Sequence, residues 1–198
     1  SNVVKQDLIK NAIYSVLLSL IGIIIYVSIR FKFSYAIGGI VALLHDVLMM
    51  FAVFAITRLE VNTMFIAAVL AIIGYSINDT IVCFDRIREN LKQYDKKLTK
   101  EKLKEIVNKS LQETFTRTIV TALTTIFCII GLMLFGPKDI FALDTAMLVG
   151  SIAGTYSSIF IAINIFLFFE SKNLNKTPKA KKVYKDDVEE KLVKGVNC

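Results

Sequence analysis

Apolar residues fall into five long blocks that are separated by short polar stretches. The blocks cover about residues 11–29, 36–57, 64–84, 119–135 and 142–169. Each has roughly 17–25 residues or slightly more, which is the length that an α-helix needs to cross about 30 Å of hydrocarbon. A soluble domain scatters its apolar residues rather than grouping them in this way. The pattern therefore predicts an all-α integral membrane protein, a bundle of five transmembrane helices within residues 11–170.

The connection between the third and fourth blocks has a helical pattern of its own. Apolar residues recur there at helical spacing, with Lys and Glu between them, at Leu103, Ile106, Val107, Leu111 and Phe115. We expect an amphipathic helix that starts near Thr99 and leads into the fourth span. Such a helix either covers the inner face of the bundle or docks a partner, and the pattern leaves both open.

Two segments flank the predicted bundle. Residues 1–10 are expected to form an outer N-terminal segment, and residues 171–198 a basic cytoplasmic tail that is mostly disordered. We expect this tail to be attracted to anionic lipids at the cytoplasmic face. We expect no nucleic-acid partner, because a lysine run with a single tyrosine is a weak sign of one. Since the chain opens on Ser1, we expect a piece excised from a longer protein, with Ser1-Asn2 left over from cloning.

Positive charge is concentrated on alternate connections between the blocks. Of the 24 Lys and Arg residues, ten lie in Asp85–Arg117, eight in Glu170–Cys198 and two in Arg30–Ser34. Short loops rich in Lys and Arg stay on the cytoplasmic side of a membrane. We therefore expect the N-terminus outside, the C-terminus in the cytoplasm, and the loops Arg58–Thr63 and Gly136–Asp139 facing outward.

The sequence shows no pattern typical of a metal site or of enzyme chemistry. Its three cysteines, Cys83, Cys128 and Cys198, form no spaced pair, so neither a disulfide framework nor a zinc site is indicated. No pattern pairs a nucleophile with a base or forms a phosphate-binding glycine loop. We expect no cofactor and no enzyme activity.

Small residues recur at every fourth position of the fifth block, at Ala146, Gly150, Gly154, Ser158 and Ala162. In lipid, close backbone contact at small residues holds helices together. We therefore expect Gly150, Gly154 and Ser158 to be helix-packing positions. Asp144 heads the same block, and we expect it to cap the helix.

Three charged residues lie within the apolar blocks or open one of them. Asp79, next to Asn78, lies five residues before the end of the third block, about 7–8 Å in at 1.5 Å per residue. Asp46 lies ten residues into the second block, roughly 15 Å deep, and Arg117 opens the fourth. An ionised Asp in mid-membrane costs about 2.5–3.5 kcal/mol on insertion scales. Such residues therefore face the bundle interior, pair, or stay protonated.

Arg117 begins a polar stripe at helical spacing that continues through Thr121, Thr124, Thr125 and Cys128. An antiparallel fourth helix could bring Arg117 within reach of Asp79. A carboxyl group held between burial and a neighbouring positive charge can take up and release a proton.

Static interpretations stay open for each of these residues. Asp79 could be a buried hydrogen-bonding group, Arg117 an anchor at the membrane edge, and Asp46 a structural hydrogen-bond acceptor next to His45. The threonines could donate only to carbonyls of their own helix. The residue types alone do not decide between these readings.

The motif GYSINDTIVCFDRIREN, residues 74–90, closely resembles the signature of the SecF family, membrane subunits of the bacterial SecD–SecF complex of the Sec protein-export machinery. The stretches ALLHDVL, TRTIVTALTTIFCIIGLMLFG and AMLVGSIAGTYSSIFIA resemble the same family in the same order. The resemblance covers about residues 36–170 well and the first block more loosely. The family belongs to the resistance–nodulation–division superfamily, whose export branch uses proton flow to help move polypeptide outside the membrane.

This resemblance implies roles for particular residues. The family's proton-path aspartate corresponds to Asp79, and the arginine it depends on corresponds to Arg117. Asn78 joins them in the expected proton path, with Asp46, Thr121 and Thr125 as possible accessory residues.

The resemblance also implies partners and a location. These are a SecD subunit that supplies a further acidic residue, the Sec translocon, the exported polypeptide, protons, and the bacterial cytoplasmic membrane. Family members begin with one more span and an outer domain, so the five blocks match the second to sixth spans of the family.

Two other functions remain alternatives. One is half of a proton-driven small-molecule efflux transporter of the same superfamily, which should show a substrate pocket. The other is a non-transporting membrane scaffold, in which polar residues such as Asp79 only fix helix register. The scaffold predicts that Asp79→Asn leaves function intact.

Overall fold

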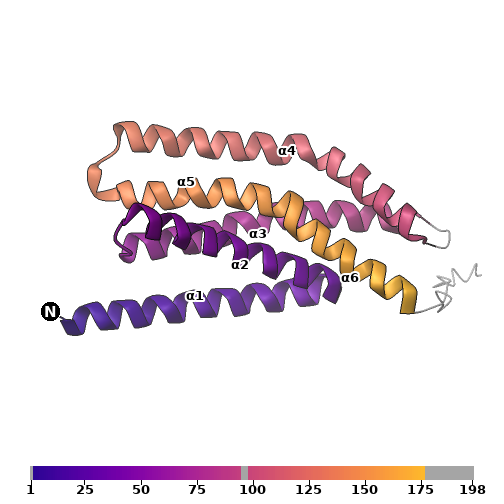
Figure 1. Ribbon diagram of the computed structural model, residues 1–198, viewed down its shortest axis with the longest axis horizontal. Helices are drawn as coiled ribbons and strands as arrows, with labels where there is room; N and C mark the ends of the chain where they lie inside the picture. Colours follow the sequence, from indigo (N-terminus) through magenta and orange to yellow (C-terminus); the bar gives the residue numbers. More distant parts are fainter. Residues whose placement is uncertain (1, 95–97, 177–198) are drawn as a thin grey trace, which may run out of the picture.

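The computed structural model describes residues 2–94 and 98–176, and almost all of these are helical (Figure 1). The α-helices are α1 (Asn2–Arg30), α2 (Phe33–Thr57), α3 (Thr63–Lys92), α4 (Lys100–Phe135), α5 (Phe141–Tyr156) and α6 (Ala162–Lys176). A short 3₁₀ turn, η1 (Lys138–Ile140), precedes α5, and a π-helical segment, η2 (Ser157–Ile161), joins α5 to α6. The predicted all-α bundle is confirmed.

The helices run side by side along one axis, with α4 at one edge and α1 at the opposite edge (Figure 1). Helix α3 packs against α2, α4 and α5, and α2 also packs against α5 and α6. The end of the bundle where α3 finishes and α4 begins is called the charged end below. The opposite end carries the α2–α3 and α4–α5 connections.

Four helical stretches are long and apolar enough to cross a membrane, namely Phe33–Thr57, Thr63–Lys92, Lys100–Phe135 and Lys138–Leu174. They contain the predicted second to fifth spans. The predicted first span lies in α1, whose apolar part, Tyr14–Val27, is shorter. Residues 2–10, expected as a separate outer segment, are helical and belong to α1.

Local chemistry explains where the helices begin and end. The Asn62 side chain accepts a hydrogen bond from the Phe65 amide at 3.1 Å, and Thr99 accepts one from Lys102 at 3.3 Å. Both are N-caps, which satisfy amides that have no partner within the helix. Helix α2 stops at Arg58, which takes a left-handed φ of 55°.

The predicted amphipathic helix and the predicted fourth span are one continuous helix, α4. No Pro or Gly interrupts the sequence between Lys100 and Ile130, so nothing breaks the helix where its surroundings change. Leu103 and Val107 are fully buried in the core of the bundle, whereas Phe115 is 51 % exposed. Most apolar side chains of this segment therefore pack against the other helices of the bundle and are not free to dock a partner.

The predicted fifth span is not one regular α-helix, because the π-helical segment η2 interrupts it. The Ser157 hydroxyl donates to the Gly154 carbonyl at 3.2 Å, which competes with the regular backbone ladder. A Cβ atom at Gly38 of α2 would lie 2.5 Å from the Ala162 carbonyl oxygen, so the backbones touch directly after η2. Residues 171–176, expected to belong to the tail, continue α6, and the rest of that tail lies outside the described residues.

Aromatic rings join α2, α3 and α6 near the charged end. The ring of Tyr35 stacks on Phe166 with centroids 4.2 Å apart and meets the edge of Phe84 at 5.1 Å. Such pairs contribute about 0.5–1.5 kcal/mol each beyond their buried area. This cluster holds the last turns of α3 in place, two turns from the polar residues described next.

Candidate functional site

Asp79 lies on the buried side of α3 and is only 6 % exposed. Its Oδ2 atom has no hydrogen-bond partner among the described residues. A buried polar atom without a partner costs about 1–3 kcal/mol, and more when it is charged. Helix packing does not offset this unfavourable free energy, so Asp79 is a candidate functional residue.

Arg117 of α4 is the charged group that acts on Asp79, as the antiparallel arrangement predicts. The two side chains nevertheless form no ion pair in the described part of the chain. Arg117 is exposed and lines a cleft of about 330 Å³ between α3 and α4. The electrostatic link between Asp79 and Arg117 therefore acts without a direct ion pair.

The cleft lies directly between Asp79 and the charged end. Its walls include Val82 and Arg86 of α3, three and seven residues after Asp79 and thus on the same helical face. Thr114 of α4 forms the other side, and its hydroxyl lies 3.7 Å from the Cys83 sulfur. The cleft therefore lies on the Asp79 side of α3, toward the charged end, although Asp79 itself does not line it.

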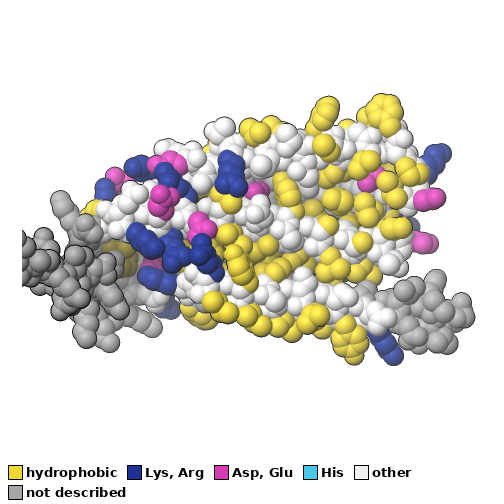
Figure 2. All heavy atoms as spheres, turned by 180° about the vertical axis from the view of Figure 1, so that it is seen from behind, with side chains coloured by type: hydrophobic (Ala, Val, Ile, Leu, Met, Phe, Trp, Pro, Cys, Tyr) yellow, Lys and Arg dark blue, Asp and Glu magenta, His cyan; other side chains and the backbone are white. Residues whose placement is uncertain are grey.

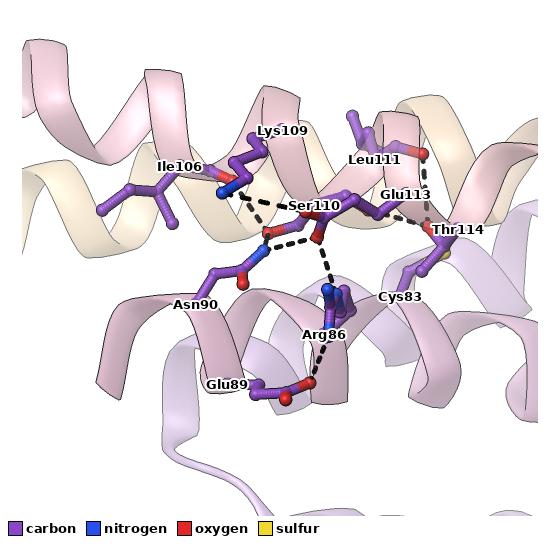
Figure 3. Close-up of polar contacts among 10 residues, drawn as sticks. All are labelled: Cys83, Arg86, Glu89, Asn90, Ile106, Lys109, Ser110, Leu111, Glu113 and Thr114. Carbon is purple, nitrogen blue, oxygen red and sulfur yellow. Dashed lines mark hydrogen bonds and ion pairs between the residues drawn. The ribbon is translucent and has the colours of Figure 1, made fainter. Parts of the chain in front are cut away.

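A polar network that includes the cleft residues Arg86 and Glu113 fastens α3 to α4 (Figure 3). Arg86 Nε donates to Glu113 Oε2 at 2.6 Å, and Asn90 Nδ2 donates to the same oxygen at 2.8 Å and to Ser110 Oγ at 2.9 Å. These hydrogen bonds, first that of Arg86 and then that of Asn90, hold the pKa of Glu113 below its ordinary value. Glu113 therefore stays ionised at neutral pH and keeps both donors.

Sequence reasoning did not assign these network residues. Arg86 and Asn90 are four apart within the charged motif after Phe84, so they share one face of α3. That spacing was the available signal. No sequence pattern marks Glu113 and Ser110, because their contacts with α3 form only when the two helices pack together.

Tyr75 lies one turn before Asp79 on α3, and its buried hydroxyl also has no hydrogen-bond partner. The hydroxyls of Thr121 and Thr125 on α4 lie near it. Both threonines donate to carbonyls of their own helix, Thr121 to Arg117 and Thr125 to Thr121, at 2.9 Å each. The static interpretation therefore accounts for the hydroxyl protons of both threonines.

The structure corrects the expected grouping of Asn78 with Asp79. Consecutive residues on an α-helix point about 100° apart, and the buried face of α3 takes Asp79. Asn78 is exposed, and so is Gly74 one turn earlier, with open space around it. Asn78 thus lies on an outward face of α3, whereas Asp79 lies on the buried one.

Asp46 of α2 is fully paired. Ser76 Oγ donates to its Oδ2 at 2.5 Å, and His45 Nδ1 lies 3.2 Å from its Oδ1. The side chain is 1 % exposed and ties α2 to α3. The geometry therefore fits the static interpretation of Asp46 better than an accessory role in proton transfer.

The small residues after Asp144 lie against α3. A Cβ atom at Gly150 would stand 2.6 Å from Ile72 Cγ1, and one at Gly154 would stand 3.2 Å from the Ser76 Cβ. Ser158 Oγ lies 2.9 Å from Thr80 Oγ1. The three contacts advance by four residues on both helices, so α3 and α5 are parallel and closely packed.

Asp144 does not cap its helix. The N-cap position of α5 is Ile140, without a side-chain hydrogen bond, because the turn η1 starts the helix four residues earlier than expected. Asp144 is instead 1 % exposed, with its Oδ1 unpartnered.

Cys83 is buried and Cys128 is exposed, and both are free thiols. Cys198 lies outside the described residues. Within residues 2–94 and 98–176, no group of three His, Cys, Asp or Glu side chains is placed to hold a metal ion.

Comparison with known proteins gives consistent matches. The family model described as protein export membrane protein SecD/SecF, C-terminal, matches residues 1–172. The protein translocase subunit SecDF of Bacillus subtilis is 50 % identical over 176 residues, which is 89 % of this chain and 24 % of the relative. The protein translocase subunit SecF of Alicyclobacillus acidocaldarius is 45 % identical over 179 residues, 90 % of this chain and 58 % of the relative. The chain thus spans between a quarter and somewhat over half of these relatives.

Solved structures with the same fold are also SecDF proteins. The crystal structure of SecDF from Thermus thermophilus matches with a TM-score of 0.74 and 39 % identity, over 82 % of this chain and 22 % of that one. A SecDF structure in a super-membrane-facing form matches with a TM-score of 0.75 and 35 % identity, over 84 % and 22 %.

Proposed function

The chain belongs to the SecD/SecF family of protein-export membrane proteins, and we propose that it is the membrane part of a SecF-type subunit that couples proton flow to late-stage protein export. The observation that carries the coupling is Asp79, a buried carboxyl whose Oδ2 has no partner and which faces the field of Arg117. The relatives named as translocase subunits support the export role. The proposed role is transport and involves no enzymatic step.

The coupling begins with a change of charge on Asp79. The ionised carboxylate attracts the Arg117 guanidinium across the gap between them, and protonation removes that attraction. Because Arg117 lies on α4, the alternation shifts α4 relative to α3. A membrane potential contributes about 2.3 kcal/mol per elementary charge per 100 mV, enough to bias two arrangements of a bundle.

The outward face of α3 and α4 is the proposed contact with the SecD half. It exposes Gly74 and Asn78 on α3, and Arg117, Thr121 and Cys128 on α4. Polar side chains at membrane depth are costly against lipid, and small residues allow a second helix to approach closely. On this proposal Asn78 contributes to the partner contact, and SecD supplies a further acidic residue to the path.

The proposed location is the bacterial cytoplasmic membrane, with the charged end toward the cytoplasm and the N-terminus of the chain outside. Lys and Arg side chains gather at the charged end (Figure 2). Loops of this composition stay in the cytoplasm and attract anionic lipids. The Sec translocon and the exported polypeptide are the proposed partners on the outer side.

The efflux alternative has one structural feature in its favour. An almost entirely apolar cleft of about 380 Å³ lies between α2 and α5, lined by His45, Met49, Val149, Ile152, Ala153 and Tyr156. Its size is that of a small-ligand pocket, but its lining supplies few polar groups to orient a substrate. The export role therefore remains the better supported of the two.

The test is Asp79→Asn in the full-length protein together with its SecD partner. In cells depleted of the wild type, we expect maturation of a secreted reporter, followed by pulse-chase, to stall at normal subunit abundance. Asp139→Asn, an exposed aspartate of η1, is the control and should export normally. Normal export by Asp79→Asn would leave the buried carboxyl a register device, as the scaffold alternative predicts.

A further inference from the structure

Buried polar atoms without partners are confined to two neighbouring helices. In the described part of the chain these side-chain atoms are Tyr75 Oη and Asp79 Oδ2 on α3, and Asp144 Oδ1 and Ser151 Oγ on α5. Most buried polar groups in proteins are hydrogen-bonded, and each exception needs a physical reason. The proposed role of Asp79 explains the pair on α3 and leaves the pair on α5 unexplained.

Helix α5 and the segment after it carry polar side chains along one face. Asp144, Ser151, Thr155 and Ser158 follow one another at intervals of seven, four and three residues, which is the spacing of a single helical face. Asp144, Ser151 and Ser158 are buried and Thr155 is partly buried. At the end of this face, Ser158 Oγ lies 2.9 Å from the hydroxyl of Thr80, the residue after Asp79. The polar face therefore leads from one end of the bundle to Thr80, one residue along α3 from Asp79.

The register between α3 and α5 gives the distances along this face. Ile72 lies against Gly150 and Ser76 against Gly154, so Asp79 is level with Ser157 of the segment after α5. Asp144 precedes that level by 13 residues, or about 20 Å at 1.5 Å per residue. Ser151 and Tyr75 lie between the two carboxyls in depth.

Asp144 has no charged partner. None of the ion pairs among the described residues includes it, and the residue is 1 % exposed. The charged side chains near this end include Arg58, Glu60, Lys138 and Asp139, all exposed, and the exposed Lys10 of α1. Lys5 and Asp7 precede Lys10 in the same helix. The flanking segments of α2, α3 and α4 contain no charged residue between Val47 and Thr57, Thr63 and Tyr75, or Phe127 and Phe135. A carboxyl in such a place is one that binds a proton.

We propose that Asp144 is a second proton-binding carboxyl and that the polar face of α5 carries protons between it and Asp79. The inference rests on the proposed function and adds the outer half of the path. A hydronium O–H bond breaks and an O–H bond forms on the Asp144 carboxylate, which leaves a water molecule. The Asp144 carboxyl then gives its proton to a water molecule near Ser151, which restores the carboxylate. Thr155, whose hydroxyl donates to the Ser151 carbonyl at 2.8 Å, offers only its lone pairs to this path. Water molecules between the hydroxyls would bridge the steps, and the proton ends on the Asp79 carboxylate.

The experiment uses the full-length protein with its SecD partner in proteoliposomes, with proton flux read by an internal pH dye. We expect Asp144→Asn to reduce the flux to the level of Asp79→Asn. Asp144→Glu, which keeps the carboxyl, should restore part of it, and the exposed control Asp139→Asn should keep wild-type flux. If Asp144→Asn fails to assemble, Ser151→Ala should still lower the flux, because it interrupts the same face.

A second readout follows the proton itself. Infrared spectroscopy should show the carbonyl band of a protonated carboxylic acid that disappears in Asp144→Asn and persists in Asp139→Asn. Wild-type flux in Asp144→Asn, with flux lost in Asp79→Asn, would overturn this inference and leave the proposed function standing. Flux retained in Asp79→Asn would overturn the proposed function and with it the path. If the carbonyl band of the protonated acid persists in Asp144→Asn, Asp144 does not bind the proton, whatever the flux measurements show.

Discussion

The aspartates inside the bundle differ in what surrounds their carboxyl oxygens. Asp46 accepts from Ser76 and lies against His45, so both of its oxygens are occupied. Asp79 and Asp144 each keep a buried oxygen without a partner. A satisfied carboxyl adds rigidity, whereas an unsatisfied one changes its energy strongly when it gains or loses a proton. The distinction separates a structural aspartate from two that are suited to proton transfer.

At the residue scale, Gly150 provides a test of the close packing between α3 and α5. We expect Gly150→Ala to destabilise the bundle by about 1–3 kcal/mol, because the added Cβ would stand 2.6 Å from Ile72 Cγ1. Gly131→Ala on α4 is the matched control, since nothing lies within 4 Å of its Cβ position. Thermal denaturation of the detergent-solubilised protein gives the midpoints. Equal midpoints for the two variants would show that the contact at Gly150 is not tight.

At the element scale, α3 and α4 contact each other in two regions that differ in how their polar groups are satisfied. In the apolar part the two helices enclose Tyr75 and Asp79, whose buried atoms are unsatisfied. Toward the charged end, Arg86, Asn90 and Glu113 form a satisfied network. This arrangement fixes the relative position of the helices at one end and leaves the proton site free to change its contacts.

Asn90→Ala tests that network. Removal of the amide leaves Ser110 Oγ and Glu113 Oε2 without one of their donors, so we expect a loss of about 1–3 kcal/mol. Asn108→Ala, an exposed position on α4, should change stability by less than about 0.5 kcal/mol. Thermal denaturation compares them. Because Ala has a higher helix propensity than Asn, propensity alone would stabilise both variants. Equal midpoints for the two variants would show that the network does not contribute to stability.

At the scale of the whole molecule, charge is distributed unevenly between the two ends of the bundle. The connections at the charged end and the end of α6 carry most of the Lys and Arg residues, whereas the α2–α3 connection has Arg58 and the α4–α5 connection has Lys138. Loops rich in Lys and Arg stay on the cytoplasmic side, so this asymmetry predicts the orientation of the whole bundle across the membrane. On the proposed orientation, the proposed proton path runs from the Asp144 end outside to the cleft at the charged end inside.

Labelling of single introduced cysteines measures that orientation directly. In a variant without the native cysteines, Lys138→Cys should react with a membrane-impermeant maleimide added to intact cells. Asn108→Cys should react only after the cells are permeabilised, because its part of α4 lies at the charged end. The opposite labelling pattern would reverse the orientation and the direction of the proposed path.

The sequence by itself determined those features that depend only on residues close together in the chain. Apolar blocks long enough to span a bilayer predicted the membrane helices, and the charges within or next to these blocks pointed to Asp79 and Arg117. The small residues at every fourth position indicated the close face of the fifth span. These features depend on hydrophobicity and on helical spacing, which can be read along the chain.

Only the tertiary structure decided which polar atoms have partners. It placed Asn78 outward and Asp79 inward, paired Asp46 with Ser76, and left Asp144 buried and unpartnered where a cap was expected. It also joined the amphipathic segment to the fourth span and inserted the π-helical segment η2. Hydrogen-bond partners come from other helices, so their presence or absence is a property of the packed bundle and is not contained in any one segment.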